Sequence, residues 1–134
     1  MTTPSIIEKW HQLVETKDIS LLDELLADDA CMYSPVIHTV QKGKAITKMY
    51  LAGAAMTLAN DQFKYVREVY DDGFAMLEFE TEIEGIFING VDMISWNEDE
   101  KITDFKVMIR PLKGINMLHK KMGEALEAFK SGKA

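Results

Sequence analysis

The sequence predicts an α+β fold in which three helices precede a set of long antiparallel strands. Two observations carry this prediction. Apolar residues recur at helical spacing over most of the chain before Asn60, and after Asp61 the pattern changes to the alternation of strands. Asp71-Asp72-Gly73 then separates two alternating runs, which is the signal of a turn between paired strands.

The first two helices are predicted from their capping residues and apolar stripes. Thr3 can cap the first helix, with Pro4 in its first turn, where the missing N–H is harmless. Its stripe consists of Ile6, Ile7, Trp10, Leu13 and Val14. Asp18 can cap a second helix, which should end near Asp28-Asp29. The apolar side of that helix consists of Leu21, Leu22, Leu25 and Leu26.

A short strand and a third helix follow. Residues 31–33 form an apolar run that Pro35 interrupts, as expected for a short strand. The third helix should begin after Gly43. Its buried side is expected to consist of Ile46, Met49, Tyr50, Gly53 and Met56.

Four long strands and a terminal helix complete the predicted order. The strands should span residues 63–70, 74–83, 87–96 and 102–110, and Pro111 should open the last helix. Asn89-Gly90 is also a hairpin signal, but a hairpin there would leave a very short strand before it. We therefore expect one long strand with a glycine bulge, which would bend the sheet.

Composition limits the class of protein and its partners. The 134 residues, 47% of them hydrophobic and 28% charged, predict one soluble globular domain over 1–134. A net charge of −7 argues against nucleic acid and anionic membranes as partners. The single cysteine, with no signal peptide or apolar run of membrane-spanning length, predicts a cytoplasmic protein.

Asp92 is the most informative residue, because it is an acid inside an apolar strand. A buried carboxylate is costly unless it is paired or used for chemistry. Asp92 has the strand parity of Ile88, Ile94 and Trp96, but the opposite face is also apolar. Two apolar faces predict a sheet that is covered on both sides, which favours a dimer. The structural alternative is an acid paired with Arg67.

Several segments resemble the nuclear transport factor 2-like superfamily. They are Leu26-Ala27-Asp28-Asp29-Ala30 with Ser34-Pro35 and Gly43, and Gly90-Val91-Asp92-Met93-Ile94 with Lys101-Ile102 and Arg110-Pro111-Leu112. The second group is similar to bacterial members of the SnoaL-like branch. The resemblance implies a cone-shaped antiparallel sheet wrapped around the N-terminal helices. It also implies an apolar pocket in the cone and homodimers formed through the outer sheet face.

The same resemblance implies limits on activity. In ketosteroid isomerases a protonated Asp and a Tyr donate to an oxyanion. Asp92 matches that Asp, but Ser34 stands at the position of the base and Trp10 at that of the Tyr, so steroid isomerase activity is not expected. The epoxide-hydrolase branch needs an Arg where this chain has Gly90. The polyketide-cyclase branch asks mainly for an apolar pocket and one acid, which Asp92 would supply.

The remaining candidates follow from their expected places around the cone. The residues expected to line the pocket are Trp10, Tyr33, Ser34, Tyr50, Phe79, Phe105 and Ile109. His38 could act as a base at its mouth, or be an exposed loop residue, and His11 and His119 are expected at the surface. No phosphate loop, dinucleotide fingerprint or metal-spaced histidine pair is present in the sequence, so we expect neither a cofactor nor a metal.

Three hypotheses for function remain open. The chain could hold a small apolar ligand that Asp92 orients. It could be a cyclase or isomerase acting on a carbonyl compound, with Asp92 as proton donor or oxyanion stabiliser and His38 or Tyr33 in a minor role. It could also be a structural dimer without a working pocket.

Overall fold

A curved six-stranded sheet with helices on one side forms the protein, as the computed structural model shows for residues 2–130. The helices are α1 (Ser5–Thr16), a 3-10 turn (Ile19–Leu21), α2 (Leu22–Leu25), α3 (Lys44–Leu58) and α4 (Leu112–Lys130). The strands are β1 (Leu26–Tyr33), β2 (Gln41–Lys42), β3 (Lys64–Asp71), β4 (Phe74–Ile83), β5 (Ile86–Trp96) and β6 (Ile102–Arg110). The predicted α+β class is therefore confirmed.

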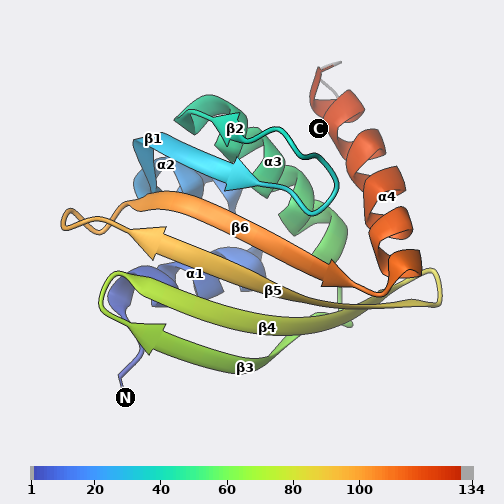
Figure 1. Ribbon diagram of the computed structural model, residues 1–134, viewed down its shortest axis with the longest axis horizontal. Helices are drawn as coiled ribbons and strands as arrows, with labels where there is room; N and C mark the ends of the chain where they lie inside the picture. Colours follow the sequence, from blue (N-terminus) through green and yellow to red (C-terminus); the bar gives the residue numbers. More distant parts are fainter. Residues whose placement is uncertain (1, 131–134) are drawn as a thin grey trace.

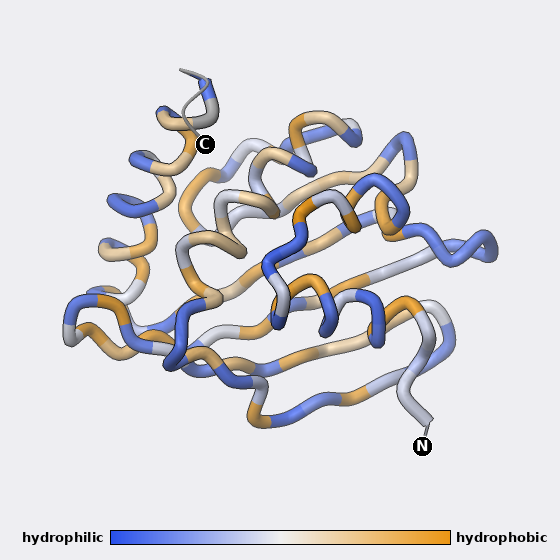
Figure 2. The backbone as a smooth tube through the Cα atoms, turned by 180° about the vertical axis from the view of Figure 1, so that it is seen from behind, coloured by the Kyte–Doolittle hydropathy of each residue, from blue (hydrophilic) through white to orange (hydrophobic). Residues whose placement is uncertain are grey.

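The sheet has the order β2-β1-β6-β5-β4-β3. Every neighbouring pair is antiparallel except β1 and β6, which run parallel. Figure 1 shows α1, α2 and α3 behind the sheet, while α4 stands at one end of it. From the opposite side the helices lie in front, with hydrophobic and hydrophilic residues alternating along them (Figure 2). The described residues include no helix with both the length and the apolar character needed to cross a membrane.

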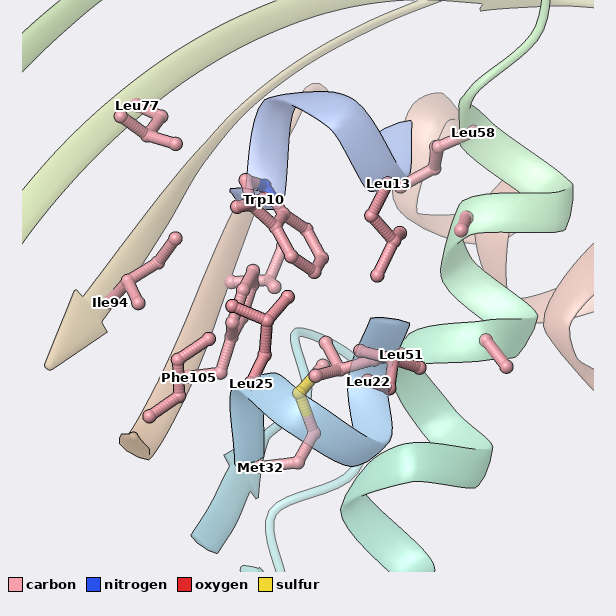
Figure 3. Close-up of a cluster of buried hydrophobic side chains, with 14 of the residues drawn as sticks. Trp10, Leu13, Leu22, Leu25, Met32, Leu51, Leu58, Leu77, Ile94 and Phe105 are labelled. Carbon is pink, nitrogen blue, oxygen red and sulfur yellow. The ribbon is translucent and has the colours of Figure 1, made fainter. Parts of the chain in front are cut away.

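The core lies between α1, α2, α3 and the concave face of the sheet (Figure 3). The apolar stripe of α1 is buried as the sequence predicts, and Val14 packs against it half-buried. The ring of Trp10 lies 4.9 Å from that of Phe105 on β6. Along β4, Leu77, Phe79 and Ile83 are buried on the inner face. Burial of each large side chain contributes about 1.5–3 kcal/mol to folding.

The ends of the first two helices differ from the prediction. Pro4 occupies the N-cap position of α1 without a side-chain cap, and Thr3 instead donates a 3.5 Å hydrogen bond to the Tyr70 hydroxyl. Asp18 caps the 3-10 turn, as expected, by accepting from the Ser20 amide at 3.2 Å. The second helix, however, ends at Leu25, because Leu26 pairs with Ile102 and begins β1.

The buried face of α3 also differs from the predicted stripe. Met56 is 53% exposed, and Ile46, Met49 and Tyr50 are only half-buried. The buried residues are Thr47, Leu51, Ala52, Gly53, Ala55 and Leu58. Two neighbours set this face, since the Thr47 hydroxyl donates to the Ala30 carbonyl of β1 at 3.0 Å and α4 packs on the other side. Periodicity alone could not separate the two faces, because α3 is apolar almost all round.

Gly90 lies inside an unbroken strand. The absence of a hairpin at Asn89-Gly90 is confirmed, because β5 pairs with β4 in one continuous register from Ile86 to Ser95. The predicted glycine bulge is wrong for the same reason. A Cβ at Gly90 would lie 2.5 Å from Cζ of Phe79 and 2.7 Å from the Met108 carbonyl oxygen, so this position needs glycine for close approach.

Candidate functional site

A cavity of about 180 Å³ lies between the concave face of the sheet, α3 and α4. Its apolar wall includes Trp10, Val14, Met32, Leu51, Ala55, Leu58, Phe63, Phe79, Phe105, Val107, Leu118, Met122 and Leu126. Five residues with polar side chains also line it: Ser34, Tyr50, Tyr65, Asp92 and His119. A concave, apolar site with few polar groups is the usual form of a small-molecule site.

Asp92 faces inward from the middle of β5. Its neighbours across the sheet are Leu77 on β4 and Val107 on β6, both buried. Asp92 itself is 6% exposed, and it shares the inner face with Ile88 and Ile94. The sequence left open which face of the sheet carries Asp92. The structure places Asp92 on the inner face, among the residues that line the cavity.

A chain of two hydrogen bonds reaches Asp92 from helix α1. The indole Nε1 of Trp10 donates to the Tyr65 hydroxyl oxygen at 2.8 Å, and that hydroxyl donates to Oδ2 of Asp92 at 2.6 Å. The suggested pair of Asp92 with Arg67 is wrong. Arg67 instead binds Glu78, with Nη2 2.7 Å from Oε1.

The second carboxyl oxygen, Oδ1 of Asp92, has no hydrogen-bond partner among residues 2–130. Tyr65 is the sole hydrogen-bond partner of the Asp92 side chain within residues 2–130, and it binds Oδ2. Every fully buried side-chain oxygen or nitrogen in this part of the chain has a partner, so Oδ1 is not fully buried. Because Asp92 is a lining residue of the cavity, we infer that this oxygen is exposed to that space.

Burial is the main cause of the shifted pKa values of Asp92 and Tyr65. Desolvation raises the pKa of Asp92 from 3.8 to about 7, and the bond from Tyr65 opposes the rise. Burial and the neighbouring Asp92 raise the pKa of Tyr65 well above 10.0. The phenol therefore remains a hydrogen-bond donor at neutral pH, while the carboxyl is divided between its neutral and charged forms.

The structure gathers some of the predicted site residues and separates others. Trp10, Ser34, Tyr50, Phe79 and Phe105 line the cavity together with Asp92, whereas Tyr33, His38 and Ile109 are not among its lining residues. The Tyr33 ring lies beneath Nζ of Lys106, 4.9 Å away, and His38 is exposed in its loop. Ile109 is paired with Gly90 on β5, and its side chain packs half-buried against the core.

Sequence reasoning missed Tyr65 because of a register shift. Tyr70 and Glu68 pair with the inward-facing Ala75 and Leu77, so simple alternation would turn residue 65 outward. The shift between Tyr65 and Arg67 places Tyr65 opposite Phe79 and turns it inward again. The turn signal and the inward position of Phe79 were the available clues, but the shift itself has no sequence signature here.

Of the two histidines expected at the surface, His119 lies there and His11 does not. His11 is half-buried, with Nε2 2.8 Å from Oε2 of Glu68. His119 is exposed on α4, yet it lines the cavity. Within residues 2–130, no three His, Cys, Asp or Glu side chains are grouped closely enough to hold a metal ion.

Comparisons with known proteins agree on one fold and one family. The family described as the SnoaL-like domain matches residues 7–105. The structure is similar to a steroid delta-isomerase from Pseudomonas aeruginosa, with 31% identity and a TM-score of 0.88 over 95% of this chain and 93% of that one. A bacterial protein of cystatin-like fold from Silicibacter pomeroyi is 28% identical, with a TM-score of 0.82 over 90% and 84% of the two chains.

A more distant likeness concerns the fold alone. A protein of ketosteroid isomerase-like fold from Catenulispora acidiphila, crystallised with trimethylamine, is 17% identical, with a TM-score of 0.63 over 85% of this chain and 91% of that one. A search of curated proteins found no match. The neighbours agree with the nuclear transport factor 2-like fold that the sequence suggested.

Proposed function

This chain belongs to the SnoaL-like domain family, and on that premise we propose that it binds a small, largely apolar molecule in the cavity, with Asp92 as the orienting group. Apolar contact supplies the affinity, and the carboxyl fixes the direction of the ligand. A net charge of −7 leaves no support for nucleic acid or an anionic membrane as a partner.

The accessible Oδ1 of Asp92 is the observation that carries the proposal. A purely structural acid would be expected to have both oxygens bonded to the protein, because an unpaired buried carboxyl oxygen is costly. Here the Tyr65 hydroxyl donates to Oδ2, and Oδ1 is left for the apolar cavity. This arrangement, together with a cavity of about 180 Å³, favours a ligand site over the alternative of a filled structural core.

The second candidate is an enzyme that isomerises or cyclises a carbonyl compound. The likeness to a steroid delta-isomerase at 31% identity supports it, as does the neutral form of Asp92, which can donate to a carbonyl oxygen. Ser34 cannot serve as a carboxylate base, and its Oγ accepts from the amides of Val36 and Ile37 at 3.1 and 3.4 Å. A proton acceptor in such an enzyme would have to be another lining group, and the imidazole of His119 is one that carries a nitrogen able to accept a proton.

One experiment separates binding from catalysis. The probe is cyclohex-3-enone, a β,γ-unsaturated ketone whose conjugated isomer absorbs in the ultraviolet. For a binding protein we expect saturable binding by NMR titration with no isomerisation above the buffer rate, and a weaker affinity in Asp92→Asn. For an enzyme we expect isomerisation whose kcat falls in Asp92→Asn at similar KM. Unchanged affinity and absent turnover in both proteins would remove Asp92 from the function.

The outer face of the sheet supports the further proposal of a homodimer. Val69, Met76 and Met108 are 59%, 39% and 52% exposed on this face. Glu78 lies on the same face between Arg67 and Arg110, which both lower its pKa. A face that carries apolar groups and both signs of charge can pair with a two-fold-related copy of itself. For the compartment, we propose the cytoplasm, which suits a single unpaired cysteine.

A further inference from the structure

We propose that strand β3 pairs edge to edge with β3 of a second copy of this chain, in the antiparallel register that places Val69 opposite Val69. The segment concerned is residues 67–71, which follow the register shift of β3. This contact uses the edge of the sheet and not its outer face, so it is distinct from the homodimer proposed above. It does not rest on the ligand site or on that homodimer.

The edge of the sheet at β3 is open. β3 is the last strand in the order β2-β1-β6-β5-β4-β3, and within residues 2–130 no strand pairs with it on the side away from β4. Figure 1 shows β3 as the outermost strand of the sheet. An open edge presents unpaired backbone N–H and C=O groups, which form a template for the addition of another strand.

The backbone groups that point toward this edge belong to Glu68 and Tyr70. A two-residue turn at 72–73 joins β3 to β4, and Asp71 pairs with Phe74 at its base, so these two residues exchange backbone hydrogen bonds. Bonded and non-bonded pairs alternate along an antiparallel ladder. The N–H and C=O groups of Tyr70 and Glu68 consequently point away from β4.

Two-fold symmetry limits the possible registers. A two-fold axis perpendicular to the sheet keeps each face of the sheet on the same side in both copies, so the residue at the axis lies opposite itself. An axis at any charged residue of the segment would set like charges opposite each other. These residues are Arg67, Glu68 and Asp71. An axis at Tyr70 would set Glu68 opposite Asp72, so Val69 is the position that remains.

The outer side of the Val69 register is complementary. Arg67 lies opposite Asp71 of the second copy, once on each side of the axis, and opposite charges in such pairs are stabilising. Arg67 binds Glu78 through Nε and Nη2, and its side chain is 76% exposed, so Nη1 can still reach a second carboxylate. At the axis, the two Val69 side chains, each residue 59% exposed, form a close non-bonded pair.

The inner side of this register leaves no pair of like charges facing each other. Glu68 lies opposite Tyr70 of the second copy, and the two residues exchange both of their free backbone bonds, which gives four bonds over the whole contact. The carboxylate of Glu68 is held by its own chain: Oε2 lies 2.8 Å from Nε2 of His11, and Oε1 accepts from the Tyr70 hydroxyl. It is therefore directed toward α1 rather than across the axis.

The strength of the contact follows from its small size. Four backbone hydrogen bonds and one pair of valines should give a dissociation constant of about 0.1–1 mM. The edge contact is thus expected at higher protein concentrations than a face-to-face dimer. The two contacts can coexist, because edge pairing leaves the outer faces of both copies on the same side of the sheet and accessible.

Hydrogen exchange followed by NMR tests the pairing in the full chain. The Met108→Glu variant, which carries a charge on the outer face, allows the edge contact to be measured alone. Between about 50 µM and about 1 mM protein, we expect exchange of the Glu68 and Tyr70 amides to slow several-fold, because these groups become bonded in the pair. The amides of Arg67 and Val69, which are bonded to β4, should change little and serve as the internal control.

A charge reversal tests the register. In the Met108→Glu background, Asp71→Lys sets two positive charges opposite each other on both sides of the axis, so the dissociation constant from sedimentation equilibrium should rise about tenfold. Added salt should reduce this difference. The matched control is Asp99→Lys, the same change of charge at an exposed residue of the turn between β5 and β6, which should leave the dissociation constant within about twofold.

Each outcome decides the question. Exchange rates at Glu68 and Tyr70 that do not depend on concentration, with a monomer up to about 1 mM, would overturn the inference. Equal effects of Asp71→Lys and Asp99→Lys would overturn the register. If Met108→Glu does not fold, the same exchange measurement in the wild type decides, because a face-to-face contact leaves the edge amides of β3 unbonded. If Asp71→Lys does not fold, Asp71→Asn should weaken the association several-fold.

Discussion

At the scale of single residues, Asp92 links stability to the proposed chemistry. The carboxyl lies among Leu77, Val107 and Ile94, where its charged form has lost most of its hydration. The bond from Tyr65 recovers part of that loss, and the pKa stays raised at about 7. An acid that lines a cavity and has a pKa near 7 is the combination expected of a functional group.

The cost of this acid should be visible as a pH dependence of stability. In the unfolded chain Asp92 releases its proton near pH 3.8, and in the folded protein only near pH 7. The folded state therefore holds more protons in this window, so the free energy of unfolding falls as pH rises through it. The loss is about 4 kcal/mol in total and is complete above pH 7.

Asp92→Asn should lack this loss, because it has no proton to release. Relative to the wild type, we expect the variant to gain stability between about pH 4 and pH 7 in urea denaturation. The control is Asp23→Asn, where a bond from Lys48 lowers the pKa of an exposed carboxyl, so its difference from the wild type should change in the opposite direction, and only below about pH 4. Parallel pH profiles for the wild type and Asp92→Asn would contradict the raised pKa.

At the scale of elements, two local features of the strands shape the cavity: the close packing around Gly90 and the register shift in β3. The side chains of Phe79 and Ile109 converge over Gly90, and this leaves no room for a Cβ on β5. On β3, the register shift before Arg67 turns Tyr65 toward Asp92. Neither feature changes the element order, but together they shape the wall of the cavity.

Gly90→Ala is expected to destabilise the protein by about 1–3 kcal/mol, as overpacking a closely packed site does. The new Cβ would lie 2.7 Å from the backbone oxygen of Met108, which cannot move as a side chain can. Gly123→Ala on α4 is the control. It meets no atom within 4 Å, and it should stabilise the helix by up to about 1 kcal/mol. Thermal unfolding of both variants measures the contrast, and equal effects would contradict it.

At the scale of the whole molecule, the two faces of the sheet have different roles. The inner face covers the core and the cavity, whereas the outer face leaves Val69, Met76 and Met108 accessible. An apolar patch of this kind on a sheet is typical of an interaction surface. The proposed occupant is a second copy of this chain.

If the proposed dimer forms, Met108→Glu should convert it to a monomer, because it places a charge among the apolar side chains of the outer face. Sedimentation equilibrium at micromolar concentration measures the change. Met56→Glu is the control, since Met56 is 53% exposed on α3, away from the sheet. A wild-type protein that sediments as a monomer would remove the dimer proposal, and the cavity would be unaffected.

Local pattern by itself determined most of the elements of this protein. The helical spacing of residues 6–14 and the alternation of residues 74–83 each bury one face, so the hydrophobic effect selects the element that the pattern describes. The α+β class followed from their order. The inward position of Phe79 followed from alternation within its own strand.

Only the tertiary structure decided which face of each helix and strand packs against its neighbours. The second helix ends at Leu25 because Leu26 pairs with Ile102 of β6. Helix α3 buries Thr47 rather than Met56 because β1 and α4 pack against that side. The bond between Tyr65 and Asp92 depends on a register shift that no local pattern records. Contacts between residues 27 positions apart arise from packing of the whole chain, and the polarity of the candidate site depends on such contacts.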